Sequence, residues 1–188
     1  MISDTSTPCS LSAFLILLTV AAVPFFTCSN SCFSMCSHNG LDVGEDGKTH
    51  QCIDYIGVMR NLFGYKTIVP ADPNQTDRVT RYVAKTPGNF LVVMGRSSIP
   101  ILLTEEGAPL FGTSYEFRYG HTDLVRNGKD AAILTTGGMV YKAIQAWQKL
   151  REKGVAVQVI NISCAPARAE AFQSRCRALS VGSMSRML

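Results

Sequence analysis

Apolar residues along most of the chain alternate between the spacing typical of a helix and that typical of a strand. Segments with a period near 3.6 residues predict helices, and short apolar runs bounded by glycine or proline predict strands. The predicted helices are 49–64, 73–86 and 139–154, and the predicted strands are 32–38, 65–72, 90–95, 131–138 and 155–163. Because strands and helices alternate, the pattern predicts an α/β fold with a parallel sheet.

Residues 97–121 interrupt this alternation. They hold two prolines and three glycines and show no clean period, so we expect an irregular connection. The strand, helix and strand that follow form one β-α-β unit, and since a lone unit leaves both sheet edges open, we interpret it as the start of a second domain. The predicted organisation is an atypical apolar segment 1–36, a partial first domain 37–112, a partial second domain 113–164 and a poorly ordered tail 165–188.

The N-terminal part contains no acidic residue, lysine or arginine between Asp4 and Asp42, and residues 11–26 form an apolar run. This run is shorter than the roughly 20 residues that span a bilayer, and no basic residue precedes it as in a secretory signal. We therefore expect a buried helix and no membrane association, with a signal peptide or membrane anchor as the alternative.

Composition excludes several function classes. The chain is 46% hydrophobic and 17% charged, which is typical of a globular protein, and its net charge of +4 is spread without a basic cluster, which argues against nucleic acid. The seven cysteines include no CxxC pair, and no HExxH motif occurs, so a zinc site is not indicated. Reduced thiols in a cytoplasmic protein are the simplest interpretation.

The stretch SHNGLDVGEDGKTHQ, residues 37–51, carries the candidate chemistry. It follows the strand 32–38 at its carboxyl end, where α/β proteins bind ligands, and it leads into a helix predicted to hold His50 in its first turn. Imidazole donates to phosphate and carboxylate accepts from hydroxyl groups, so His38, Asp46 and His50 suit a hydroxylated phosphate ester. The alternative is an exposed turn.

Arg96 follows the buried strand 90–95 and reaches the same edge of the sheet. An arginine in this position either pairs with a carboxylate or binds a phosphate. We expect His38, Asp46, His50 and Arg96 to converge at this edge around a sugar phosphate.

These blocks resemble the transketolase family. SHNGLDVGEDGKTHQ is similar to the family's Ser/Thr-His followed by a Gly-Glu-Asp-Gly-x-Thr-His-Gln loop, and IVPADPNQT with the strand leading to Arg96 resembles the next blocks of its pyrimidine-binding domain. Residues from RNGKDAAILTTGG to VAVQVINI resemble the opening of its C-terminal domain. The likeness covers about residues 37–164 and is nearest to the C-terminal subunit of split transketolases.

The resemblance implies a thiamine diphosphate enzyme that moves a two-carbon ketol unit between sugar phosphates, as in the pentose phosphate pathway. It implies that His38 and Asp46 contact the substrate, that Arg96 holds its phosphate, and that His50 lies beside the cofactor. Phe14 matches the aromatic residue that stacks on the cofactor's pyrimidine ring. Magnesium and the diphosphate are expected on a partner subunit in a homo- or hetero-oligomer.

Departures from the family pattern qualify these expectations. The glutamate that activates the cofactor lies upstream of the stacking aromatic, and this sequence begins too late to contain it, so we name no catalytic residue and expect no activity from the chain alone. Leu17 replaces a second aromatic. The alternatives are another thiamine diphosphate enzyme, either deoxyxylulose-phosphate synthase or the beta subunit of a 2-oxo-acid dehydrogenase, or a non-catalytic remnant that only assembles with a partner.

Overall fold

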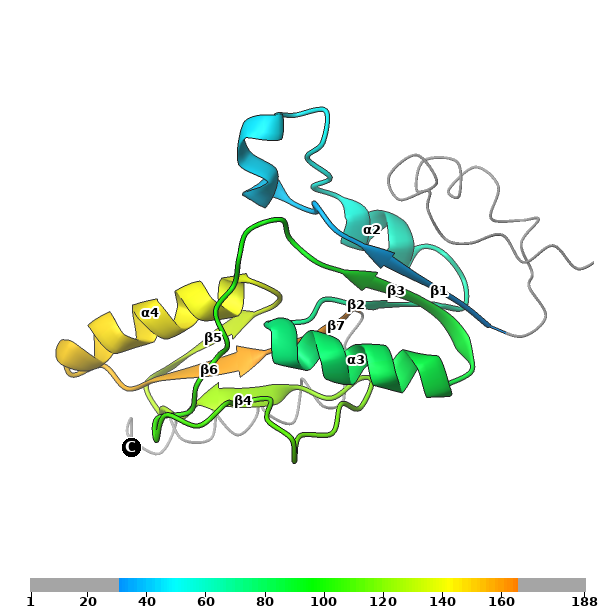
Figure 1. The fold of residues 1–188 in the computed structure, drawn as a ribbon. Coiled ribbons are helices and arrows are strands. Elements are labelled where there is room, and N and C mark those ends of the chain that lie inside the picture. The colour runs from blue at the N-terminus through cyan, green and yellow to red at the C-terminus, as the bar shows by residue number, and fades with distance from the viewer. Residues whose placement is uncertain (1–30, 166–188) are drawn as a thin grey trace, which may run out of the picture.

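The computed structural model describes residues 31–165, which form two sheets with helices packed against them (Figure 1). The predictions for Phe14, the apolar run 11–26 and the tail beyond Ala165 lie outside the described residues. Within residues 31–165, the helices are too short or too polar to cross a bilayer.

The two sheets have different strand orders. The first runs β1 (Ser31–Cys36), β3 (Gly88–Val93), β2 (Tyr65–Ile68) and β7 (Cys164–Ala165), and the second runs β4 (Asp123–Arg126), β6 (Val157–Asn161) and β5 (Ala131–Thr135). The helical elements are the 3₁₀ segment η2 (Leu41–Asp46), α2 (Tyr55–Arg60), α3 (Pro73–Lys85) and α4 (Met139–Glu152). β1, β2 and β3 are mutually parallel, as are β5 and β6, so the predicted parallel α/β architecture is confirmed.

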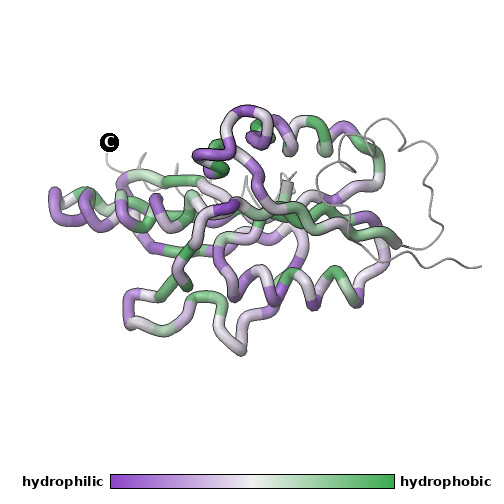
Figure 2. The backbone as a smooth tube through the Cα atoms, turned by 45° about the horizontal axis from the view of Figure 1, so that its top comes forward, coloured by the Kyte–Doolittle hydropathy of each residue, from purple (hydrophilic) through white to green (hydrophobic). Residues whose placement is uncertain are grey.

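Strand β3 lies at the centre of the first sheet and is covered on both faces. Phe90 and Val92 pack into the cluster that contains residues of α3, while Leu91 and Val93 pack into the cluster that contains Met59 of α2. Because successive side chains of a strand point to opposite faces, a strand between two helices needs apolar residues at every position. This explains the unbroken apolar run that predicted it. Figure 2 shows hydrophobic and hydrophilic residues alternating along α3 and α4, as expected for helices with one face on a sheet.

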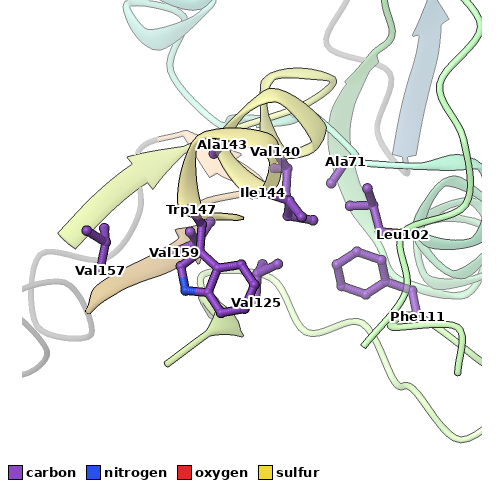
Figure 3. Packing of buried hydrophobic residues seen from close by; sticks show 10 residues of the cluster. All are labelled: Ala71, Leu102, Phe111, Val125, Val140, Ala143, Ile144, Trp147, Val157 and Val159. Carbon is purple, nitrogen blue, oxygen red and sulfur yellow. The ribbon is translucent and has the colours of Figure 1, made fainter. Parts of the chain in front are cut away.

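The connection 97–121 contains no regular helix or strand, as predicted, but it is not a loose linker. Leu102 and Phe111 are almost fully buried and belong to the same core cluster as Val140, Ile144 and Trp147 of α4 (Figure 3). The side chains of this connection therefore fill the space between α4 and the first half of the chain. The predicted domain boundary at 112/113 stays a prediction.

A buried polar network also joins the two halves. Gln75 of α3 is fully buried, and its Nε2 donates to Tyr115 Oη, Asp123 Oδ2 and Ser163 Oγ at 3.1, 3.0 and 3.2 Å. Its Oε1 accepts from Asn161 Nδ2 at 3.2 Å. Buried polar groups are costly unless they are paired, so this network favours one fixed arrangement of the two sheets.

Several elements differ from the prediction. The helix expected from Thr49 begins only at Tyr55, because residue 52 pairs with Asn39 in a β-bridge and its carbonyl accepts from Gly40 N at 2.9 Å, which keeps this stretch extended. Ile53, which lies within the predicted helix, is 72% exposed. Strand β4 was not predicted, and it covers one edge of β6 in antiparallel pairing, so that edge is not open.

The buried thiol of Cys164 should lower the free energy of unfolding at alkaline pH. Burial raises the pKa of its thiol from 9.0 to about 11, although Gly120 N donates to Sγ at 3.3 Å. The native state keeps this proton where the unfolded chain loses it, so the stabilisation is complete below pH 9 and falls as pH rises from 9 towards 11. We expect a loss of about 2 to 3 kcal/mol, measured by denaturant unfolding at several pH values. Cys164→Ala should flatten this pH dependence, and an unchanged profile would contradict the assignment.

Candidate functional site

A cleft of about 660 Å³ lies where the carboxyl ends of strands from both sheets meet. Its walls come from the residues after β1, β2 and β3 on one side, and from Thr136, Gly137 and the start of α4 on the other. Asn39, Asp42 and Lys142 contribute polar side chains to a lining that is otherwise largely apolar. Ligands of α/β proteins bind in this position relative to the sheet, so the cleft is the candidate binding site.

The loop that carries the predicted site residues is tied to the end of β3. Asn39 is buried, its backbone N–H donates to the Met94 carbonyl at 3.3 Å, and its Nδ2 donates to the carbonyls of Cys36 and Met94, each at 3.3 Å. His38, just before it, has a φ of 63°, which is uncommon for a residue with a side chain. The chain turns sharply here as it leaves β1.

Asp42 forms a second attachment between this loop and the segment after β3. Its Oδ2 accepts from the backbone N–H of Ser97 at 2.9 Å, and its Oδ1 accepts from Ser97 Oγ at 2.5 Å. These two hydrogen bonds stabilise the carboxylate and lower the pKa of Asp42 below its usual value. A Cβ on Gly95 would lie 2.6 Å from Asp42 Oδ2, so a larger residue there would displace the Asp42 carboxylate.

Arg96 holds the outer part of the same loop. Its Nη1 lies 3.1 Å from Asp46 Oδ2 and donates to the Val43 carbonyl at 2.9 Å, and its Nη2 lies 3.5 Å from Glu45 Oε1. Of the two roles predicted for this arginine, pairing with a carboxylate is the one present. The side chain is 36% exposed, so the guanidinium also remains open to solvent.

The structure brings together two of the four predicted side chains, Asp46 and Arg96. His38 and His50 are exposed. Within residues 31–165 their Nδ1 atoms interact only with the neighbouring hydroxyl groups of Ser37, at 2.9 Å, and Thr49, at 3.0 Å. His50 lies in a turn and not in the first turn of a helix, because α2 begins five residues later. The convergence of all four on one ligand stays a prediction.

Sequence reasoning missed the residues that line the cleft beside the predicted ones. Asn39, Asp42, Gly95 and Ser97 each lie within four residues of His38, Asp46 or Arg96 and contact the cleft, whereas the predicted four do not line it. One signal was available, since a glycine directly after a buried strand and before an arginine indicates a close approach to that backbone. Its partner, Asp42, could not be identified without the fold.

The described residues do not by themselves provide a metal site. Residues 31–165 contain no group of three or more His, Cys, Asp or Glu side chains that could hold a metal ion. At the rim of the cleft, Asp42 is committed to Ser97 and Asp46 to Arg96. The chemistry that these side chains can provide here is recognition of hydroxyl and phosphate groups.

Removal of the Asp42 carboxylate should release the loop without unfolding the sheet. We expect Asp42→Ala to lower the free energy of unfolding by about 1 to 2 kcal/mol and to accelerate hydrogen exchange of the Ser97 amide, measured by mass spectrometry. Asp54→Ala is the matched control, because Asp54 precedes α2 without a side-chain capping bond. Equal effects of the two substitutions would show that Asp42 does not fasten the loop.

Comparisons with known proteins match the same two regions. The family model of the transketolase pyrimidine-binding domain matches residues 27–100, and that of the transketolase C-terminal domain matches residues 120–173. One subunit of the apulose-4-phosphate transketolase of Actinobacillus succinogenes is 30% identical over 136 residues, which are 72% of this chain and 41% of that protein. A putative transketolase C-terminal section of Methanocaldococcus jannaschii is 30% identical over 127 residues, 68% of this chain and 38% of that protein. The chain thus spans about two fifths of the length of these relatives.

Solved structures agree with these matches. A split-gene transketolase, described as an inactive beta4 tetramer, superposes with a TM-score of 0.58 at 27% identity over 70% of this chain and 39% of the other. Transketolase from Campylobacter jejuni has the same fold, with a TM-score of 0.55 at 22% identity over 70% of this chain and 20% of that one. Matches to two transketolase domains, one after the other along the chain and on the fold of solved transketolases, show that the chain belongs to the transketolase family.

Proposed function

We propose that this chain is the pyrimidine-side part of a thiamine diphosphate-dependent enzyme that transfers a two-carbon ketol unit between sugar phosphates. The observation that carries the proposal is the pairing of Arg96 with Asp46 at the carboxyl edge of β3, beside the cleft. An arginine and a carboxylate at one edge suit the phosphate and hydroxyl groups of a sugar phosphate. Relatives that are named as one subunit of a transketolase support the assignment.

In this proposal the chain's own residues bind and orient the sugar. Arg96 binds the phosphate, Asp46 accepts hydrogen bonds from hydroxyl groups, and His38 and His50, whose Nε2 atoms have no partner among the described residues, exchange protons with the reacting hydroxyl groups. Thiamine diphosphate, when bound, supplies the stabilisation of a carbanion that ketol transfer needs.

The cofactor's diphosphate and its magnesium would be held elsewhere. Because the described residues offer no metal ligands as a group, we propose that a diphosphate-binding partner subunit supplies them and that activity requires a homo- or hetero-oligomer. We also propose that the protein acts in the cytoplasm, which the free thiols of Cys32, Cys36, Cys52 and Cys164 support. Cell fractionation would test the location.

The decisive experiment is a ketol-transfer assay on the purified chain, alone and with the diphosphate-binding subunit of a split transketolase. Xylulose 5-phosphate is the donor and ribose 5-phosphate the acceptor. We expect no turnover by the chain alone and sugar phosphate binding by the mixture. Turnover by the chain alone would refute the need for a partner, and a mixture that neither binds nor converts sugar phosphates would refute the function.

The same mixture separates the alternatives. Use of pyruvate in place of xylulose 5-phosphate would identify another thiamine diphosphate enzyme, either a deoxyxylulose-phosphate synthase or the beta subunit of a 2-oxo-acid dehydrogenase. A synthase of the first kind in Lysinibacillus sphaericus is 29% identical to this chain over 119 residues. Co-purification with the partner but no calorimetric signal for the cofactor would identify a non-catalytic assembly protein.

A further inference from the structure

A second concave site lies on the C-terminal half, away from the cleft. It is a groove of about 560 Å³ between β4, α4 and the segment around Glu105, and its lining residues include Arg126, Trp147 and Arg151. The groove shares no lining residue with the cleft at the edge of the first sheet. Nothing in the proposed ketol transfer uses these side chains.

Arg126 is a buried cation without an ion-pair partner among the described residues. It is only 6% exposed, and its Nη1 and Nη2 donate to the carbonyls of Val125 and Leu103, each at 2.7 Å. Its Nε is enclosed and has no hydrogen-bond partner. A buried guanidinium normally pairs directly with a carboxylate or another oxyanion. Here Glu105 and Glu106 act on its charge from beyond ion-pair distance, and the two carbonyls leave one donor without a partner.

Arg151 brings a second guanidinium to the same indole ring. The Cζ of Arg126 lies 5.2 Å from the centre of the Trp147 ring, and the Cζ of Arg151 lies 5.1 Å from it. Trp147 is nearly buried in the core cluster (Figure 3), which fixes the ring as a support for both cations. Two arginines on one rigid ring are thus held ready for an anion, against the opposing charges of Glu105 and Glu152 in the same lining.

The carboxylate of Glu105 occupies a position in which an anionic oxygen contacts Arg151. Glu105 Oε2 lies 2.9 Å from Arg151 Nη1, while the Glu105 side chain is 43% exposed and the Arg151 side chain 64%. An exposed ion pair of this kind contributes little to stability and can exchange with solvent ions. Glu105 therefore acts as an internal competitor that an external oxyanion can displace.

We propose that the groove formed by Arg126, Trp147 and Arg151 binds a small oxyanion, a phosphate or carboxylate group, in competition with Glu105. The binding is independent of the cleft and of a partner subunit. It supplies a close oxyanion for Arg126, which within residues 31–165 has only the more distant charges of Glu105 and Glu106.

Trp147 is the sole tryptophan of the sequence, so its fluorescence reports on this groove directly. The full chain is titrated with inorganic phosphate and, separately, with malonate, at an ionic strength held constant with sodium chloride. We expect a saturable fluorescence change with at least one of the two, and the comparison distinguishes phosphate from carboxylate as the preferred group. A response to neither, or an equal response to chloride, would overturn the proposal.

Matched variants test the geometry. Glu105→Gln removes the competitor and should lower the Kd of the oxyanion several-fold, whereas Arg151→Gln should raise it by about tenfold or more. Arg118→Gln and Glu116→Gln, which alter an exposed Arg–Glu pair outside the groove, should leave the Kd unchanged. Arg126→Gln should abolish binding, and because that variant removes a buried side chain, its folding is checked by circular dichroism. A Kd that does not respond to Arg151→Gln and Glu105→Gln would contradict the proposal even if Arg126→Gln fails to fold.

Discussion

Replacement of Arg96 with glutamine should weaken the binding of a sugar phosphate to the assembled enzyme by about 10- to 100-fold. A charged hydrogen bond between a guanidinium and a phosphate contributes about 1.5 to 3 kcal/mol, and glutamine retains neither the charge nor the paired donors. The measurement is a calorimetric titration of the complex with xylulose 5-phosphate, so it does not depend on turnover.

Two controls separate phosphate binding from support of the loop. Arg81→Gln removes another arginine that pairs with a carboxylate, Asp77, on the exposed side of α3, and it should leave the Kd unchanged. Unphosphorylated xylulose should bind the wild type and Arg96→Gln equally. If both sugars lose affinity to the same extent, Arg96 acts only by holding Val43, Glu45 and Asp46 in place.

Replacement of Gln75 with leucine should lower the free energy of unfolding by about 3 to 5 kcal/mol. Leucine has a similar size but leaves the buried Ala71 amide without its acceptor. It also removes one hydrogen-bond partner each from Ser163, Asn161 and Asp123, which keep the bonds among themselves. Unpaired buried polar groups are more costly than the hydrogen bonds themselves are stabilising. Denaturant unfolding followed by circular dichroism measures the change.

The hydrogen bonds of Gln75 also predict whether the two halves of the protein unfold together. Because the network links α3 to β4 and β6, the two halves should unfold together in the wild type and at separate denaturant concentrations in Gln75→Leu. Gln145→Leu, the same substitution on a partly exposed position of α4, should change stability by less than about 1 kcal/mol. A single sharp transition with a small shift in Gln75→Leu would show that apolar packing alone joins the halves.

Local periodicity was sufficient to predict most of the fold. The strand at Phe90–Val93 and the helix with Val140, Ile144 and Trp147 were predicted because their burial follows directly from spacing along the chain. The start of α2 was missed because its position is decided by the pairing of Asn39 with Cys52, two residues from different segments. Leu102 and Phe111 were assigned to a linker since buried residues in irregular backbone carry no period.

The pairing of Asp46 with Arg96 could be expected from the sequence, whereas the residues that line the cleft could not. Asp46 and Arg96 could be placed together because each follows a strand, and parallel strands end at one edge of a sheet. The contact of Asp42 with Ser97 joins side chains 55 positions apart, at an angle that depends on the turn at His38. A contact between residues so far apart in the sequence produces no periodic pattern from which it could be predicted.

Strand β7 has a consequence for the order in which the protein matures on the ribosome. Cys164 and Ala165 pair antiparallel with Ile68 and Thr67, so the sheet begun by the earliest described strand receives its last member from the far end of the described chain. During synthesis the edge of β2 that later pairs with β7 stays unpaired until nearly a hundred further residues have emerged from the ribosome. We expect the nascent protein to be most vulnerable to chaperone capture and misassociation in that interval.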